Sequence, residues 1–222
     1  MSFRLKVSSL IAVVLVAVLL SLGGCSRDAA VTEPTGDDST AHLYAVYPEF
    51  GDLDDMVHEA DAIIAVEFVS ARTDVIYPEL GGDDDPATNP QAGVDPAEID
   101  MTELGVPVTI STVKVTSSLK GELSAGELLE VSQVGGPMGG VQYVEDQTLL
   151  LGDIVNADSL MLFVNIHEDG SADLVSASSG VLVVEEGNGL REACTSDDHC
   201  GEQMATTVQE VRQAVEESEN SV

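Results

Sequence analysis

The chain has 222 residues, and its 40 acidic side chains against 8 basic ones give a formal net charge of −32. This charge excludes most nucleic-acid binding, because phosphate contacts need a basic protein face. A hydrophobic share of 44% supplies apolar material for a core and argues against a wholly disordered chain. Length and composition therefore predict one compact domain with tails.

A secretory signal is predicted at the start of the chain. Arg4 and Lys6 precede an uninterrupted apolar run from Leu10 to Leu20. A positive start followed by an apolar stretch of about 7 to 15 residues is typical of a signal peptide, and it is too short to span a bilayer comfortably. We therefore expect residues 1–24 to be removed on export.

The end of this segment carries a more specific motif, Leu22-Gly23-Gly24-Cys25. It resembles the lipobox of bacterial and archaeal lipoproteins. The resemblance implies transfer of a diacylglyceryl group to the thiol of Cys25 and cleavage before that residue. It predicts a protein held on the extracytoplasmic face of the cell membrane by its lipid. The alternative is an ordinary signal peptide with an incidental cysteine.

The composition after the anchor predicts a tether and an acid-rich surface. Residues 25–51 are expected to hold the lipid anchor and a flexible acidic tether, since 26–41 lack periodic apolar residues. Concentrated salt would screen the mutual repulsion of so many acids. The acid excess therefore favours a halophilic source, with an acid-rich surface of another origin as the alternative.

The remaining chain predicts mostly β structure with a helix at each end. Asp52 should cap a short helix whose apolar residues follow at spacings of three and four, and Met204 to Val215 show the same period before an acidic tail. Strands are expected at 62–72, 108–115, 128–134, 141–144, 160–166, 173–177 and 181–184. The stretch 160–166 is nearly all apolar, which predicts a central strand. A change of parity in the third stretch predicts a β-bulge near 111–112.

The order of these pieces resembles the OB-type barrels of secreted bacterial proteins, which are similar in layout to netrin and tissue-inhibitor-of-metalloproteinase modules. The resemblance covers about residues 53–186. It rests on these short segments: 60–69, Leu119-Lys120-Gly121, Gly135-Gly136, Leu151-Gly152-Asp153 and 160–164. It implies a small OB-like antiparallel β-barrel, which we place at 52–190 with a disordered insertion at about 78–107. Protease inhibition does not carry over, because the inhibitors need a free N-terminal cysteine and Cys25 would be lipidated.

Residues 191–222 are expected to form a cysteine loop and the C-terminal amphipathic helix. In an exported protein, Cys194 and Cys200 are expected to form a disulfide. The alternative is a zinc site that adds His199 to both thiolates, but a structural zinc site needs four ligands.

Two acidic segments could bind calcium. Asp83-Asp84-Asp85 could collect a divalent cation, although a solvated loop tip explains the same residues. Asn165, His167 and Asp169 resemble the opening of a calcium loop. The twelfth position is Ser176 where a glutamate is required, so a hairpin turn is the better interpretation.

We assign no catalytic, cofactor-binding or metal-ligating residue, because no spacing predicts one. The sequence favours a lipid-anchored binding or structural module of the cell envelope. Its partner would be an envelope protein, a polysaccharide or a small ligand, contacted through the loops at 78–107 and 135–147. One alternative is a surface hydrolase in which Glu145, Asp146 and Asp153 converge with His167. Another is a calcium-dependent adhesin.

Overall fold

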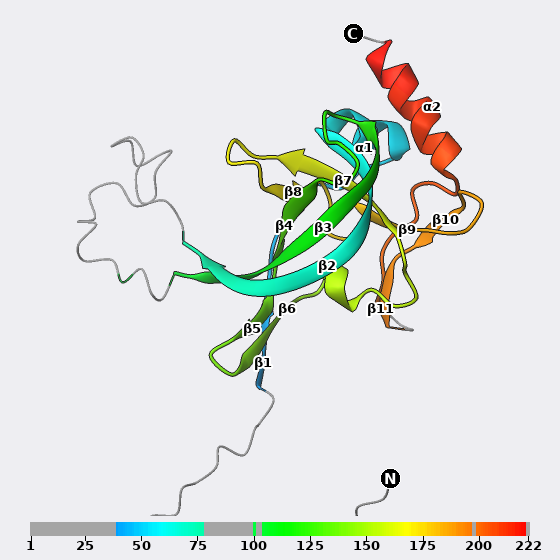
Figure 1. The fold of residues 1–222 in the computed structure, drawn as a ribbon. Helices are drawn as coiled ribbons and strands as arrows, with labels where there is room; N and C mark the ends of the chain where they lie inside the picture. The colour runs from blue at the N-terminus through cyan, green and yellow to red at the C-terminus, as the bar shows by residue number, and fades with distance from the viewer. Residues whose placement is uncertain (1–38, 78–99, 101–103, 197–198, 221–222) are drawn as a thin grey trace, which may run out of the picture. The chain divides into compact units, whose positions relative to one another are not determined.

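The computed structural model describes residues 39–77, 100, 104–196 and 199–220, and within them the chain is mostly β (Figure 1). The predicted signal peptide, Cys25 and Asp83 to Asp85 lie outside the described residues. The elements in chain order are β1 Ser39–Leu43, α1 Leu53–Glu59, β2 Ala62–Ile76, β3 Val106–Lys120, β4 Leu128–Val134, β5 Gly136–Met138, β6 Val141–Glu145, a 3-10 helix Leu151–Asp153, β7 Leu160–Ile166, β8 Ala172–Leu174, β9 Val181–Val184, β10 Leu190–Glu192, β11 Cys194–Ser196, β12 His199–Cys200 and α2 Val208–Glu219.

Both predicted helices are confirmed, and local hydrogen bonds begin each of them. Asp52 Oδ1 accepts a bond of 3.0 Å from the amide of Asp55 at the start of α1. Thr207 and Glu210 form a reciprocal capping box at the start of α2. None of the helices in the described part of the chain is long and apolar enough to cross a membrane.

The largest sheet has the strand order β10-β9-β7-β2-β3-β4-β8, and β8 pairs with β7 as well as with β4. The pairing of β4 with β8 is parallel, whereas β7 runs antiparallel to β2, β8 and β9. The prediction that 160–166 form a central strand is confirmed, because β7 has strand partners on both sides.

A smaller sheet has the order β1-β6-β5. Its first strand, Ser39–Leu43, runs parallel to β6 and lies within the segment 25–51 that was predicted to be a flexible tether. That prediction is wrong for 39–43. An edge strand needs only backbone hydrogen bonds to its neighbour, so its few apolar residues gave no pattern to detect.

The β-bulge predicted near 111–112 is confirmed only in part. β3 pairs with β4 over 108–114 without a register shift, but its pairing with β2 shifts where Phe68 faces Val113 and Ser70 faces Thr112, so the extra residue belongs to β2. One face of β3 is buried through Thr109, Ser111, Val113 and Val115. Polar side chains thus occupy two interior positions, which changes the parity of the apolar pattern without an extra residue in β3. Two further shifts between β2 and β3 lie between Ile63 and Ile64 and between Ala65 and Val66.

Two apolar clusters cover the two faces of β2 and β7, which explains why residues 62–66 are all buried. The first cluster lies between the strands of the large sheet and includes Ile64 and Leu162. The second joins Ile63 and Phe163 to apolar residues of α1 and α2, which lie beside each other in Figure 1. The amphipathic C-terminal helix therefore packs on the sheet through its apolar face.

Lys120 closes the end of α1 from a position far away in the sequence. Its Nζ donates to the carbonyl oxygens of Val57, His58 and Ala60, at 2.8, 3.3 and 2.6 Å. The last carbonyls of a helix lack partners within the helix and carry partial negative charge, so an ammonium group stabilises them.

Candidate functional site

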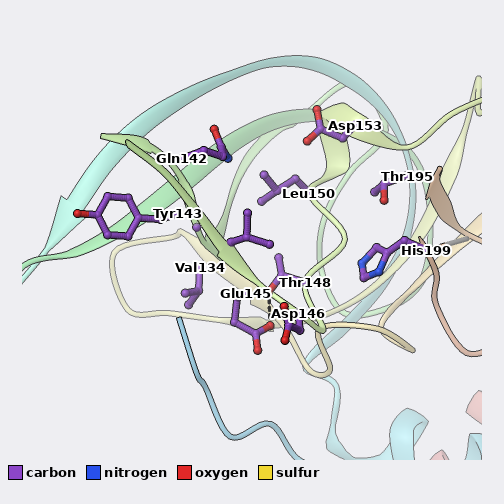
Figure 2. Close-up of a pocket in the computed structure, with 12 residues that line it drawn as sticks. Val134, Gln142, Tyr143, Glu145, Asp146, Thr148, Leu150, Asp153, Thr195 and His199 are labelled. Atoms are coloured by element: carbon purple, nitrogen blue, oxygen red, sulfur yellow. Dashed lines mark hydrogen bonds between the residues drawn. The ribbon is translucent and has the colours of Figure 1, made fainter. Parts of the chain in front are cut away.

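A cavity of about 450 Å³ opens between the β5–β6 hairpin and the loop that carries the two cysteines (Figure 2). We call it the acidic cavity. It is lined by Val134, Gly135, Gln142, Tyr143, Val144, Glu145, Asp146, Thr148, Leu150, Asp153, Thr195 and His199. Several of these residues come from the segment 135–147, which was predicted from the sequence to be a contact surface. None of the lining residues is lysine or arginine.

Glu145 is the most buried acid of this cavity, with 5% of its surface exposed. Its Oε2 accepts bonds of 3.0 Å from the amide of Gln147 and from Oγ1 of Thr148. Thr148 also contacts the hydroxyl of Tyr47 at 3.1 Å. Burial raises the pKa of the Tyr47 hydroxyl, and the bond to Thr148 opposes this effect. The chain Tyr47–Thr148–Glu145 therefore holds one carboxylate rigidly in the cavity wall.

The other two acids are exposed. Asp146 Oδ1 lies 3.2 Å from Nδ1 of His42, which β1 contributes, and Asp153 ends the 3-10 helix. Among the described residues, the one group of three ligands close enough to share a metal ion is Glu192 with Cys194 and Cys200. The three carboxylates of the cavity are thus spread along its wall.

The predicted disulfide between Cys194 and Cys200 is present. It joins β11 to β12 and places Thr195 and His199 on the wall of the acidic cavity. The alternative zinc site is not formed, because both thiols are consumed by the sulfur–sulfur bond. The disulfide therefore positions His199 at the wall of the cavity.

His167 lies in a different cavity, so the histidine proposed for a hydrolase is not beside Glu145, Asp146 and Asp153. Its Nε2 lies 3.2 Å from Oδ1 of Asp173. We call this second space, of about 420 Å³, the hairpin cavity. It is lined by Val46, Tyr47, Pro48, Ile76, Val108, Ser132, Gln133, Val134, Thr148, Asn165, His167, Asp173, Leu174, Val175 and Ala177.

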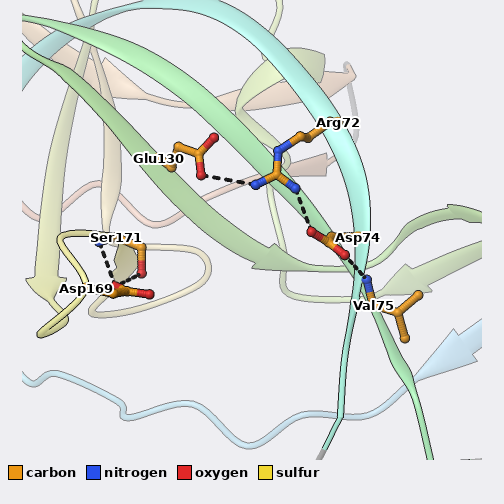
Figure 3. A network of polar contacts seen from close by, with 6 residues as sticks. All are labelled: Arg72, Asp74, Val75, Glu130, Asp169 and Ser171. Carbon is orange, nitrogen blue, oxygen red and sulfur yellow. Dashed lines mark hydrogen bonds and ion pairs between the residues drawn. The ribbon is translucent and has the colours of Figure 1, made fainter.

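The turn between β7 and β8 is the predicted hairpin, and hydrogen bonds within the turn engage its acid (Figure 3). Asp169 Oδ1 accepts from the amide and from Oγ of Ser171, at 2.9 and 2.6 Å. These bonds lower the pKa of the Asp169 carboxyl. The resemblance to a calcium loop is therefore explained by a turn that Asp169 stabilises.

Acids also surround a basic side chain on the outer face of the sheet (Figure 3). Arg72 donates to Asp74 at 2.6 Å and to Glu130 at 3.1 Å, and the hydrogen bond to Asp74 contributes most to raising the pKa of its guanidinium. Asp74 also accepts from the amide of Val75. Arg72 is therefore neutralised locally and offers no patch for an anion.

Gln133 is a buried polar residue beside the candidate site that the sequence did not indicate. It is 6% exposed, its Nε2 donates to the Leu149 carbonyl at 2.7 Å, and its Oε1 accepts from the Leu151 amide at 3.0 Å. Gln133 lines the hairpin cavity, while Leu150 lines the acidic cavity. One amide side chain thus holds the wall between the two cavities.

The sequence matches no protein-family model and no curated protein. The described residues define a mostly β protein with a disulfide-bridged loop and two neighbouring cavities.

Proposed function

We propose that this chain is a lipid-anchored, extracytoplasmic binding module of the cell envelope, built on a small OB-like β-barrel. The strand pairings support the barrel, because the path β2-β3-β4-β8-β7 returns to β2. The register shifts between β2 and β3 also support it, since bulges bend strands sharply enough for a small barrel to close.

The acidic cavity is the observation that carries the binding proposal. Its lining combines carboxylates with the amide of Gln142 and the hydroxyls of Thr148 and Thr195. Carboxylates and amides accept hydrogen bonds from hydroxyl groups. Without a cationic lysine or arginine in its lining, the cavity disfavours anions. A neutral polyhydroxylated ligand, such as a saccharide unit of an envelope polysaccharide, fits this chemistry.

The anchor has a test of its own. Replacing Cys25→Ser removes the thiol that would carry the lipid, so we expect nearly all of the protein to move from the membrane fraction to the soluble fraction. Two acyl chains supply about 0.8 kcal/mol for each buried methylene, and the variant loses this energy. Quantitative immunoblots of fractionated cells measure the ratio. Ser26→Ala serves as the matched control and should stay with the membrane, whereas retention of Cys25→Ser would contradict the anchor.

The cavity is tested with neutral oligosaccharides released from the envelope polysaccharide. We expect saturable binding to the full chain, weakened about thirtyfold by Asp153→Ala combined with His199→Ala, because each loses a hydrogen-bonding group worth about 1 kcal/mol. Calorimetry gives the dissociation constants. Glu122→Gln, an exposed change outside the cavity, should bind like the parent chain. Equal binding by all three proteins would count against the cavity.

A surface hydrolase is the second candidate, and the position of His199 favours it. His199 lines the same cavity as Glu145, Asp146 and Asp153, so an imidazole and three carboxylates share one space. Chromatography of the same oligosaccharides after incubation separates the two functions. Shortened products that disappear in the double variant would support hydrolysis, and unchanged oligosaccharides would count against it.

A further inference from the structure

The hairpin cavity has an apolar floor, and two of its four residues belong to neither packed cluster. Val108 is only 1% exposed, yet it is a member of neither apolar cluster, and Ala177 is likewise buried outside both. Leu174 of the first cluster and Val175 of the second also line the cavity. These side chains are shielded from solvent around a space of about 420 Å³, which is within the range of sites for small molecules.

The rim of this cavity is apolar as well. Val46 is fully exposed and Ile76 is 51% exposed, and both line the opening. Exposing two branched aliphatic side chains at the mouth of an apolar space costs hydration free energy that a bound apolar group would recover. Floor and rim together therefore favour a ligand with an apolar body.

One wall is polar, and strand register explains why. Asn165 and Asp173 are paired residues of β7 and β8, so their side chains lie on the same face, and His167 follows two residues after Asn165. The opposite face of the hairpin carries apolar residues of the first cluster. The register thus places a carboxylate, an imidazole and an amide on the face that lines the cavity.

Asp173 has unused hydrogen-bonding capacity. Its Oδ1 is buried, and no donor in the described residues makes a hydrogen bond to it, leaving only the ion-pair contact of 3.2 Å to His167. Burial raises the pKa of this carboxyl, against smaller lowering by His167 and by hydrogen bonds from its own backbone amide and from the Asn165 side chain. On the other side of the cavity, the Tyr47 hydroxyl is already engaged with Thr148. The Asp173 side chain is 44% exposed as a whole, so its carboxylate is the acidic group of this cavity that a donor can reach.

Charge selects between possible head groups. The described lining contains no lysine or arginine, and the whole chain carries a formal charge of −32. An anionic head would meet Asp173 inside this negative field, whereas a protonated amine would gain an ion pair.

We propose that the hairpin cavity binds a small molecule with an apolar body and a single protonated amine, which pairs with Asp173. This site is separate from the acidic cavity, with which it shares only Val134 and Thr148. It does not depend on the proposed polysaccharide binding, and either can fail without the other.

Three probes with the same ring test the proposal: cyclohexylmethylammonium, cyclohexylmethanol and cyclohexanecarboxylate. They are titrated into the full chain, and the methyl resonances of Val108, Ala177 and Val46 are followed by NMR. We expect saturable shifts at these methyl groups, with the ammonium probe binding about tenfold more tightly than the alcohol and the carboxylate binding most weakly. Absence of saturable shifts for the ammonium probe would overturn the proposal.

Variants then locate the head group. Asp173→Asn should bring the affinity for the ammonium probe down to that for the alcohol, while Asp158→Asn removes one exposed acid elsewhere and should leave both affinities unchanged. An equal loss in both variants would show attraction to the general negative charge and would overturn pairing with Asp173. Ala177→Leu fills the floor without touching the polar wall and should weaken both probes. Unchanged binding in Ala177→Leu would place the probes outside this cavity and would contradict the site.

Discussion

Replacing Gln133→Leu should destabilise the protein by about 3 kcal/mol, although the two side chains are similar in size. The substitution leaves the carbonyl of Leu149 and the amide of Leu151 without their partner, and both residues are buried in the first apolar cluster. An unsatisfied buried polar group costs about 1 to 3 kcal/mol. The wall between the two cavities should loosen, so shifts at Thr148 and Leu150 should accompany the loss of stability.

Urea unfolding followed by far-UV circular dichroism measures this effect at a fixed salt concentration. Gln142→Leu is the matched control, because it makes the same chemical change at an exposed position of the acidic cavity. It should change stability by less than about 0.5 kcal/mol. If Gln133→Leu were as mild as the control, the amide would not be what holds the segment 149–151.

The sequence predicts well the elements that depend on local patterns. The apolar run at 160–166 identifies β7 because a strand buried on both faces has no polar positions. Asp52 identifies the start of α1 because its carboxylate satisfies a helix amide, which is a local bond. The disulfide could be predicted from the expectation of export together with the cysteine count, and it is present.

Features that depend on distant partners could not be predicted. β1 pairs with β6, about a hundred residues further along the chain, and its own residues carry no apolar pattern. In the sequence, Lys120 is simply one of the few basic residues. Its hydrogen bonds to the last carbonyls of α1 become evident only in the structure, where the end of β3 lies beside that helix. Ser111 lies in the interior, where a hydrophilic residue masks the periodicity of its strand.

In the candidate site too, residues close in sequence could be grouped in advance, whereas residues brought together by the fold could not. The acids at 145, 146 and 153 could be grouped from sequence because short segments connect them, and they do line one cavity. The choice of histidine failed, because His167 is near in sequence but faces another cavity. His199 lines the same cavity as these acids because it belongs to the disulfide-bridged loop. The end of this loop packs closely at Gly201 against Ser178 and Leu149.

Replacing Gly201→Ala should displace that loop and destabilise the protein by about 3 kcal/mol. A Cβ atom at this position would lie well inside van der Waals contact of the Ser178 carbonyl oxygen and 2.8 Å from Cδ1 of Leu149. A backbone oxygen cannot rotate away as a flexible side chain can. The amide of Gly201 also donates to the Ala193 carbonyl at 2.8 Å, so the strand cannot move outward without losing this bond.

Gly51→Ala is the matched control, since its added methyl group would meet only Asp55 Oδ2 at 3.8 Å, an ordinary contact. Its stability should stay within about 0.5 kcal/mol of the parent chain. Urea unfolding gives the stability of both variants, and NMR shifts of Thr195 and His199 report the position of the loop. Because these residues line the acidic cavity, Gly201→Ala should also weaken oligosaccharide binding. Unchanged stability with unchanged shifts at His199 would mean that the loop docks without the close approach at Gly201.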